Sequence, residues 1–452
     1  MRASSRQIVA SIQRRLYASQ AAQSQTEHAP LTKQSPKVTR LPNGVTVASV
    51  ENYSPVTKLA VVFKAGARYE TGSNLGITHC LRNASSLSNN KCTGFGLTRS
   101  INQIGGSLDC TTTREHMIYT TECSRDHVDT AAEYLSYVSC NVGLKPWELK
   151  DMQPRLNVDL AVLAEQPESH LIELLHESAF RDTLGRSLYA PEFMVGHYDV
   201  DQIADYVNNH YTAGRMALVG IGIEHDDLLH YAKHFNPTSG PGVPTAPAKF
   251  SGGNKRVETG GPVTLAAIAT EAPSLNSKDL LALGVVQHLM GTGPYVKYSS
   301  GASSNKIVAA ASQATNSPFA ASCFSASYSD SGLFGFTVAG QPQDMDKVLK
   351  AAVKQFGQIT KGNIDEKDIV RAKQQLKSAL AMSLESSDVC LQDLALQAIN
   401  LGEVQSLEAL SKAIDAVSAN DVLTVAKKVI TGKPTMAAIG SLSNTPYLDQ
   451  LL

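Results

Sequence analysis

The stretch that decides the fold of this chain is GSNLGITHCLRN, residues 72–83. A turn of small and polar residues leads into a helical pattern that carries His79. Residues three and four positions further along a helix lie on the same face, and here these are Arg82 and Asn83. The stretch therefore predicts a helix that presents His79, Arg82 and Asn83 to one point.

Together with Arg68-Tyr69-Glu70 just before it, this stretch resembles the active-site helix of the pitrilysin/insulinase/mitochondrial-processing-peptidase family. In that family the helix carries an H-x-x-E-H motif, whose two histidines bind zinc and whose glutamate is the general base. The five corresponding residues here are His79-Cys80-Leu81-Arg82-Asn83. The first ligand is kept, Arg82 replaces the base, and Asn83 replaces the second ligand.

The family's third zinc ligand is a glutamate on a helix far downstream. The corresponding segment, RLNVDLAVLA at 155–164, contains no glutamate, and Asp159 is offset from the expected position. One ligand of three does not hold a catalytic zinc. A guanidinium about 5 Å from a divalent cation also costs roughly 7 kcal/mol at an effective dielectric constant of about 20. We therefore expect no catalytic residue, no metal site, no cofactor and no peptidase activity.

A second group of possible ligands is Glu224-His225 with His230 and His234. The last two are four residues apart on a predicted helix, a spacing that places two imidazoles on one face. No third ligand is evident, so an ordinary surface helix is the favoured interpretation. For His79 alone, the favoured interpretation is a helix-borne imidazole satisfied by hydrogen bonds.

The chain has 452 residues, more than one hydrophobic core usually supports, so two domains are expected. Residues 236–261 are rich in Pro, Gly, Ser and Thr, which is typical of a linker. MALVG at 216–220 recurs as MAAIG at 436–440, an offset of 436 − 216 = 220. The pattern predicts an α+β fold of two similar domains, 37–235 and 262–452, related by internal duplication.

Further elements recur in the two halves. A strand followed by a helix is expected twice, at 118–123 with 127–139 and at 334–338 with 344–358. A long charged helix that starts near Glu148 and Asp151 is echoed by one that starts at Asp365. Each domain is therefore expected to pack long helices on a mostly antiparallel sheet.

The N-terminus differs from the rest of the chain. The first twenty residues, MRASSRQIVASIQRRLYASQ, contain four arginines, and no acidic residue precedes Glu27. Their apolar residues share one face of a helical wheel, which is typical of a mitochondrial transit peptide. We predict a transit peptide at 1–17, cleaved after Tyr17, and a polar tether at 18–36.

Composition excludes several classes of function. The 40 basic and 41 acidic residues give a formal net charge of -1, so no global field attracts nucleic acid or anionic lipid. The seven cysteines never form a C-x-x-C pair, which argues against a disulfide framework, a thiolate zinc site and cysteine-bound redox centres. No apolar run reaches the ~18 residues of a spanning helix, so membrane association is expected only through partners.

Within the family, three stretches are similar to the core subunits of mitochondrial complex III, the ubiquinol–cytochrome c oxidoreductase. They are GTGPYVK at 291–297, ASYSDSGLFGF at 326–336 and MSLESS at 382–387. The resemblance implies a non-catalytic subunit on the matrix side of the inner membrane that supports assembly. It implies as partners core protein 1, cytochrome b, cytochrome c1, the Rieske protein and small subunits, in a dimeric complex that can join supercomplexes.

The alternative is the non-catalytic alpha subunit of the mitochondrial processing peptidase, which helps present presequences. That subunit carries a long glycine-rich loop in its second half. The corresponding region here, from Met290, has only two glycines before Tyr295. The resemblance therefore favours a complex III core subunit, and the altered zinc motif disfavours a third possibility, a soluble metallopeptidase.

Overall fold

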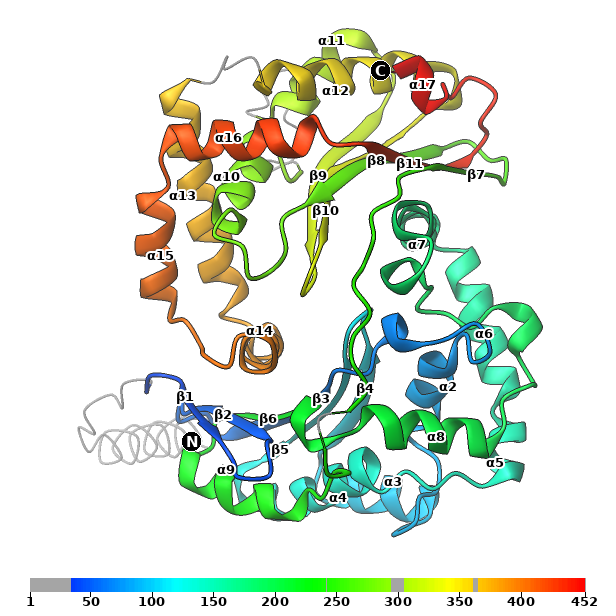
Figure 1. The fold of residues 1–452 in the computed structure, drawn as a ribbon, viewed down its shortest axis with the longest axis vertical. Coiled ribbons are helices and arrows are strands. Elements are labelled where there is room, and N and C mark those ends of the chain that lie inside the picture. The colour runs from blue at the N-terminus through cyan, green and yellow to red at the C-terminus, as the bar shows by residue number, and fades with distance from the viewer. Residues whose placement is uncertain (1–33, 241, 294–304, 361–364, 452) are drawn as a thin grey trace, which may run out of the picture.

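A computed structural model describes residues 34–240, 242–293, 305–360 and 365–451 of the chain. The predicted transit peptide and all but the last three residues of the predicted tether lie outside the described residues. Two sheets, each with its own helices, lie one above the other along the long axis of the molecule (Figure 1). The N-terminal half forms the lower part and the C-terminal half the upper part.

The first half contains a six-stranded sheet of order β1-β2-β6-β3-β5-β4. Only the pair β2 and β6 is parallel. Its strands are β1 Lys37–Arg40, β2 Thr46–Val50, β3 Val56–Phe63, β4 Ser107–Thr112, β5 Met117–Ser124 and β6 Met216–Ile221. Its helices are α2 Ile77–Ala84, α3 Gly94–Gln103, α4 Val128–Cys140, α5 Pro146–Asp151, α6 Gln153–Ala164, α7 Pro167–Phe180, α8 Val200–His210 and α9 His225–Tyr231.

The second half contains a five-stranded sheet of order β7-β11-β8-β10-β9, in which only β7 and β11 are parallel. Its strands are β7 Asn254–Glu258, β8 Thr264–Ala272, β9 Phe319–Ser327, β10 Gly332–Gly340 and β11 Pro434–Gly440. Its helices are α10 Leu280–Met290, α11 Lys306–Ala314, α12 Met345–Thr360, α13 Glu366–Ser383, α14 Ser387–Asn400, α15 Leu407–Ala416, α16 Ala419–Ile430 and α17 Leu448–Leu451.

The second sheet repeats the order β2-β6-β3-β5-β4 strand for strand, including the position of its one parallel pair. The predicted α+β fold with two similar halves is therefore confirmed. The two expected strand and helix pairs are β5 with α4 and β10 with α12.

Both faces of the first sheet are buried at its centre, where strand β3 is apolar on both sides. Along β3, Leu59, Val61 and Phe63 pack with the helices of their own half. The alternate residues Ala60 and Val62 point to the other face, as the two-residue period of a strand requires. Different partners therefore cover the two faces.

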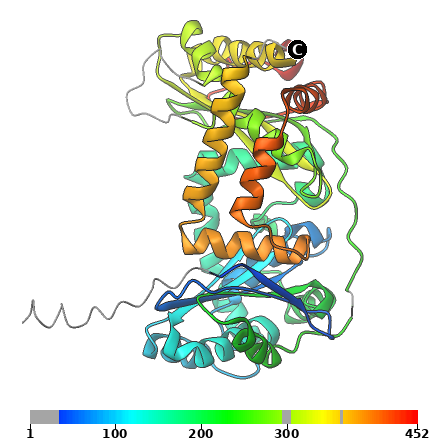
Figure 2. The same ribbon diagram turned by 90° about the vertical axis from the view of Figure 1, so that its left-hand side faces the viewer.

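The partner on that second face is a helix from the other half of the chain. Leu391 and Leu394 of α14 belong to the same apolar cluster as Ala60 and Val62. In return, α7 of the first half packs on the second sheet, where Leu175 meets Ala267. The two helices have 14 residues each and lie at an offset of 387 − 167 = 220, so duplicated helices are exchanged between the halves (Figures 1 and 2).

The C-terminal end of the predicted linker is part of the second sheet. Strand β7 lies inside the range 236–261 and pairs with β11 along Asn254 to Glu258. It is an edge strand with three charged residues among its five, so its composition is similar to that of a linker. The second sheet therefore begins at Asn254, before the predicted boundary.

The long helix predicted from Glu148 is two helices, α5 and α6, which meet at Met152. Pro154 lies in the first turn of α6, where the missing backbone N–H is tolerated, but it could not continue the hydrogen bonding of α5. Its counterpart α13 contains no proline and is continuous over 18 residues.

Candidate functional site

The helix that carries His79 is fixed at its start by a buried carboxylate. Glu70 accepts hydrogen bonds from the backbone N–H groups of Gly76 and Thr78, at 2.7 and 3.1 Å, and from the Thr78 hydroxyl at 2.7 Å. Burial raises the pKa of the Glu70 carboxyl to about 7, although these hydrogen bonds lower it. Gly76 has a φ of 76°, and a Cβ there would lie 2.4 Å from the Cα of Ala190, so glycine is required.

Asp159 of α6 lies against the face of α2 that carries His79, Arg82 and Asn83. Its Oδ2 atom accepts three hydrogen bonds: from His79 Nε2 at 2.9 Å, from Arg82 Nη2 at 2.7 Å and from Asn83 Nδ2 at 3.0 Å. We call these four residues the Asp159 cluster. The sequence analysis set Asp159 apart from the position of the family's third ligand, yet in the structure its carboxylate meets all three side chains of the altered motif.

The hydrogen bonds assign a neutral imidazole to His79. Its Nδ1 accepts the backbone N–H of Ala190 at 3.2 Å, so its proton lies on Nε2 and is donated to Asp159. Burial lowers the pKa of His79, although Asp159 opposes this effect, so the neutral form is favoured. In this state Nε2 has no lone pair to offer a metal.

These residues do not fit the zinc ion of the family. A zinc ligand directs a lone pair at the metal, whereas Arg82 and Asn83 both direct N–H groups at the shared point. The ring of Tyr189 packs over the cluster, 5.4 Å from the His79 ring and 5.7 Å from Arg82 Cζ. Among the described residues, no group of three or more His, Cys, Asp or Glu is arranged to hold a metal.

The second histidine group does not form a site either. His225 bonds Thr39 Oγ1 and Ser49 Oγ, both at 2.8 Å, and so ties α9 to β1 and β2. The rings of His230 and His234 are 6.4 Å apart, and in the described chain no third ligand joins them. All seven cysteines are free thiols.

A buried arginine, which the sequence analysis named only as part of the stretch before the His79 helix and gave no role, joins the two halves. The side chain of Arg68 is 1% exposed and donates to Glu115 Oε1 at 2.7 Å, in the loop before β5. It also pairs with Asp330, in the turn between β9 and β10, and donates to the carbonyl of Ala246 at 2.7 Å. The signal in the sequence is Asp330, which lies within the stretch 326–336 that carries the resemblance.

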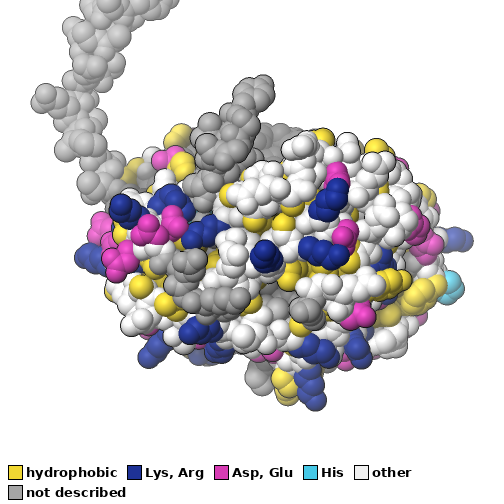
Figure 3. Space-filling model, turned by 90° about the horizontal axis from the view of Figure 1, so that it is seen from above, with side chains coloured by type: hydrophobic (Ala, Val, Ile, Leu, Met, Phe, Trp, Pro, Cys, Tyr) yellow, Lys and Arg dark blue, Asp and Glu magenta, His cyan; other side chains and the backbone are white. Residues whose placement is uncertain are grey.

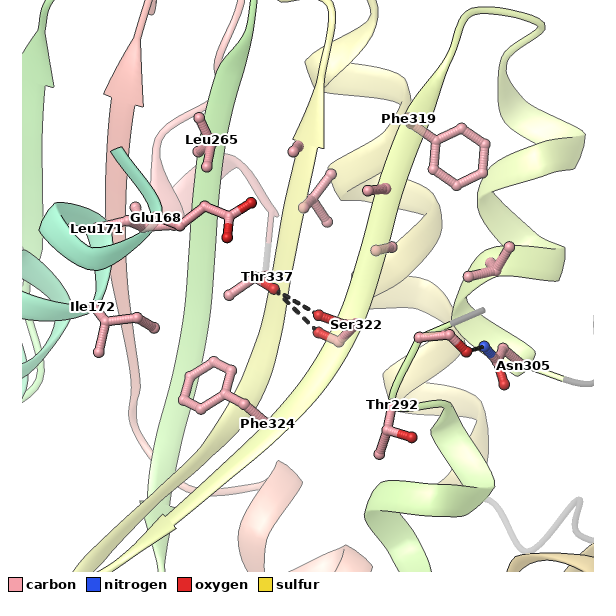
Figure 4. A pocket seen from close by; sticks show the side chains of 16 residues that line it. Glu168, Leu171, Ile172, Leu265, Thr292, Asn305, Phe319, Ser322, Phe324 and Thr337 are labelled. Atoms are coloured by element: carbon pink, nitrogen blue, oxygen red, sulfur yellow. Dashed lines mark hydrogen bonds between the residues drawn. The ribbon is translucent and has the colours of Figure 1, made fainter. Parts of the chain in front are cut away.

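A cavity of about 600 Å³ lies beside α7, next to the part of the second sheet that this helix covers. Helix α7 packs on β11 and β8, whereas β10 and β9 lie beside it, and their side chains form one wall (Figure 4). The lining is mainly apolar, and its polar side chains are Glu168 of α7, Thr292, Asn305 and the hydrogen-bonded pair Ser322 and Thr337.

Charged side chains of both signs are interspersed on the upper face of the second half (Figure 3). Lysines of α12 and α16 form ion pairs, such as Lys350 with Asp346 and Lys428 with Asp279. This face therefore carries no extended field of one sign. Among the described helices, none is long and apolar enough to cross a membrane.

Comparison with known proteins places the sequence among peptidase relatives. The model of insulinase, peptidase family M16, matches residues 46–192, and the model of the peptidase M16 inactive domain matches residues 197–376. Human "cytochrome b-c1 complex subunit 2, mitochondrial" is 41% identical over 94% of this chain and 93% of its own length. A probable mitochondrial-processing peptidase subunit alpha-1 of Arabidopsis thaliana is 29% identical over 92% of this chain and 84% of its own length.

A solved structure has the same fold. A chain of complex III2 from Candida albicans, with Inz-5 bound, aligns with a TM-score of 0.82 at 21% identity. The alignment covers 92% of this chain and 98% of that chain. The overall fold of this chain is thus shared with a chain of that complex.

Proposed function

Because this chain belongs to the M16 peptidase family, and within it is 41% identical to human cytochrome b-c1 complex subunit 2 over nearly its whole length, we propose that it is core subunit 2 of mitochondrial complex III. It is a non-catalytic subunit of an enzyme complex, ubiquinol–cytochrome c reductase, and has no zinc peptidase activity of its own. The observation that carries this is the Asp159 cluster, in which a carboxylate oxygen bound by three N–H donors lies among the former zinc residues.

The Asp159 cluster also gives the altered site a structural role. In the family the metal joins the histidine helix to the downstream helix, since both supply ligands. Here hydrogen bonds from α2 to one carboxylate of α6 make the same connection. Hydrogen bonds to an ionised carboxylate are short and strong, so the two helices stay joined without a metal.

The placement within the assembly is part of the proposal. The chain lies peripherally on the matrix side of the inner membrane and pairs with core protein 1. Its further neighbours are cytochrome b, cytochrome c1, the Rieske protein and small subunits, in a dimeric complex that joins supercomplexes. The mitochondrial relatives and the arginine-rich N-terminus support this placement. Residues 1–17 are removed on import, and 18–36 tether the first domain.

Deletion of the gene tests the proposal. We expect the assembled complex III band on a native gel to disappear, together with ubiquinol–cytochrome c reductase activity. Wild type and His79→Gln should both restore the band, because glutamine keeps a donor for Asp159 while it removes the last zinc ligand. A normal complex III level in the deletion strain would contradict the proposal. Accumulation of unprocessed precursors with intact complex III would assign the processing-peptidase alternative.

A further inference from the structure

A cavity of about 690 Å³ lies where the described chain begins, between the first sheet and three helices of the second half. Gln34, Ser35 and Pro36 form one side of it, and the end of β2 contributes Val50. The other side comes from the C-terminal end of α13, from α14 and from the start of α15, which lie above β1 and β2 in Figure 1. The cavity therefore lies on the boundary between the two halves.

Part of the lining of this cavity is apolar. Val50 and Leu394 are each 3% exposed and belong to the cluster in which α14 packs on the first sheet. Leu384 and Val404 are only half-buried, and Leu407 is 37% exposed. Apolar side chains that stay partly accessible around a cavity favour an apolar occupant, because its contact removes their surface from water.

Carboxylates give the same cavity a negative charge. Glu385, Asp393 and Glu408 are among its lining residues, whereas no described lysine, arginine or histidine lines it. The half-buried Asp393 carboxylate accepts a hydrogen bond from a neutral group, Gln397 Nε2, at 2.8 Å. Burial raises the pKa of Asp393, although this hydrogen bond lowers it. A cationic group brought beside these carboxylates would be stabilised by their charge.

The described chain starts from a fixed point in the wall of this cavity. The backbone N–H of Gln34 donates to the carbonyl of Glu51 at 3.0 Å, and its side-chain amide donates to Tyr53 Oη at 2.9 Å. The residues that precede Gln34 in the sequence are HAPLTK, 28–33. Since a chain spans at most about 3.6 Å per residue, the Cα atom of Leu31 can be no farther than about 11 Å from that of Gln34. The end of this segment is therefore within reach of the cavity.

Two side chains of this segment match the two properties of the cavity. Leu31 is the only leucine and Lys33 the only lysine or arginine between positions 18 and 36. Residues two positions apart in an extended chain point to the same side, so both side chains can enter the cavity together. At roughly 30 Å³ for each non-hydrogen atom, the volume of a water molecule, they need about 270 Å³. The cavity is large enough for both.

We propose that residues 28–33 of this chain occupy the cavity, with Leu31 against Val50 and Leu394 and with the Lys33 ammonium group at the carboxylates. The end of the predicted tether is then a strap, which joins the N-terminal segment to helices of the second half. This contact does not depend on the identity of the assembly, because both of its sides belong to one polypeptide.

Trypsin digestion of the native assembly, isolated from mitochondria, tests the strap, because Lys33 is the only site for this protease between positions 18 and 36. Gln25→Arg adds a second site in the same segment, outside the strap, and serves as the internal reference. Mass spectrometry of the released peptides should show cleavage after position 25 at least tenfold faster than after Lys33. Equal rates at the two positions would overturn the proposal.

Two matched variants separate the effect of the strap from that of the anchored Gln34. Leu31→Ser removes the apolar side chain and should raise the rate of cleavage after Lys33 at least tenfold, as the loss of a buried leucine predicts. Ala22→Ser introduces the same residue outside the strap and should leave this rate unchanged. An unchanged rate in Leu31→Ser would mean that the hydrogen bonds of Gln34 alone protect Lys33, and would refute the proposal.

Neutralisation of the carboxylates tests the place of the lysine. Glu385→Gln, Asp393→Asn and Glu408→Gln each remove one charge from the lining, whereas Glu403→Gln removes a charge outside it. At least one of the first three should raise the rate of cleavage after Lys33 about two- to fivefold, the size expected for a partly exposed ion pair. Glu403→Gln should have no effect. No change in any of the three lining variants would contradict the pairing of Lys33.

Crosslinking distinguishes the strap from a segment of another subunit. Leu31→Cys, treated with a short bismaleimide in the native assembly, should become joined to Cys390, which lines the cavity. Cys390→Ser, added to this variant, should abolish the product. A product that joins Cys390 to another protein would assign the cavity to a partner and overturn the proposal, as would the absence of a product within the chain.

Discussion

Asp159 reverses the electrostatics of the former zinc site. In the metallopeptidases a cation gathers lone pairs, whereas here an anionic oxygen gathers N–H donors from His79, Arg82 and Asn83. Two of these three donors stand in positions where the family has a base and a ligand. The geometry of the two helices is thus kept while the sign of the central charge is changed.

The first prediction concerns a variant in which a cation again occupies the centre of the site. The triple variant Arg82→Glu, Asn83→His and Asp159→Glu rebuilds the zinc pattern around His79 and should retain about one zinc ion per chain. Wild type should retain none above background, as measured by elemental analysis after removal of free metal. Arg82→Glu alone is the control and should not bind zinc, because Asn83 supplies no ligand. A triple variant without zinc would show that α2 and α6 do not keep the family's spacing.

The second prediction concerns Glu70. Its folded-state pKa is raised to about 7 by burial, so its contribution to stability is full below the unfolded pKa and is lost as the pH rises to about 7. Relative to Glu70→Gln, wild type should lose about 3 kcal/mol of unfolding free energy between about pH 4.5 and about pH 8, with no further change above that range. Denaturant unfolding of both proteins across this range measures the difference. A constant difference between them would contradict the raised pKa.

At the scale of elements, the exchange of α7 and α14 makes each sheet depend on the other half. Leu394 of α14 is 3% exposed and packs on the first sheet, whereas Val389 of the same helix is 41% exposed. Leu394→Ala should destabilise the protein by about 2–5 kcal/mol, because it leaves a cavity in the core. Val389→Ala, the control, should change stability by less than about 0.5 kcal/mol.

Hydrogen exchange locates the effect of Leu394→Ala. We expect faster exchange in β2, β3 and β6, which lie in the first sheet although the mutation lies in the second half of the sequence. Faster exchange confined to α13 and α15 would show that α14 belongs energetically to its own half. In that case the packing of α14 on the first sheet would not be what holds the two halves together.

At the scale of the whole molecule, Arg68 links three segments that are distant in sequence. It contacts Glu115, Asp330 and Ala246, which belong to the first half, the second half and the connecting chain. The M16 models divide the sequence between 192 and 197, yet β6 follows that division and still lies in the first sheet. The two halves are therefore interlocked by covalent connection, by helices and by this ion pair.

The fourth prediction tests this link. Asp330→Ala removes both carboxylate oxygens that accept from the buried Arg68 and should cost about 1–3 kcal/mol of unfolding free energy. Limited proteolysis should cut the segment 242–253 faster in this variant. Asp415→Ala, the control, removes an exposed partner of Lys377. Its unfolding free energy should stay within about 0.5 kcal/mol of wild type. Its rate of proteolysis should equal that of wild type. Equal proteolysis of all three proteins would contradict the role of Arg68.

The sequence by itself determined the duplicated α+β architecture, because the periods of strands and helices and the repeat at an offset of 220 are local properties of the chain. It also predicted, from the resemblance to the family's H-x-x-E-H helix, that Arg82 and Asn83 stand where that family has its base and its second ligand. It missed β7, whose charged edge strand has the composition of a linker, and the break at Met152.

Only the tertiary structure decided what Asp159, α7 and α14 contact. A hydrophobic pattern shows which face of an element is buried, but any apolar partner of the right shape satisfies it, and the helices α7 and α14 carry similar patterns. The hydrogen bonds of the Asp159 cluster depend on the packing of α2 against α6, which sequence spacing does not contain. The altered zinc motif could therefore be recognised in the sequence, whereas the carboxylate at its centre is visible only in the tertiary structure.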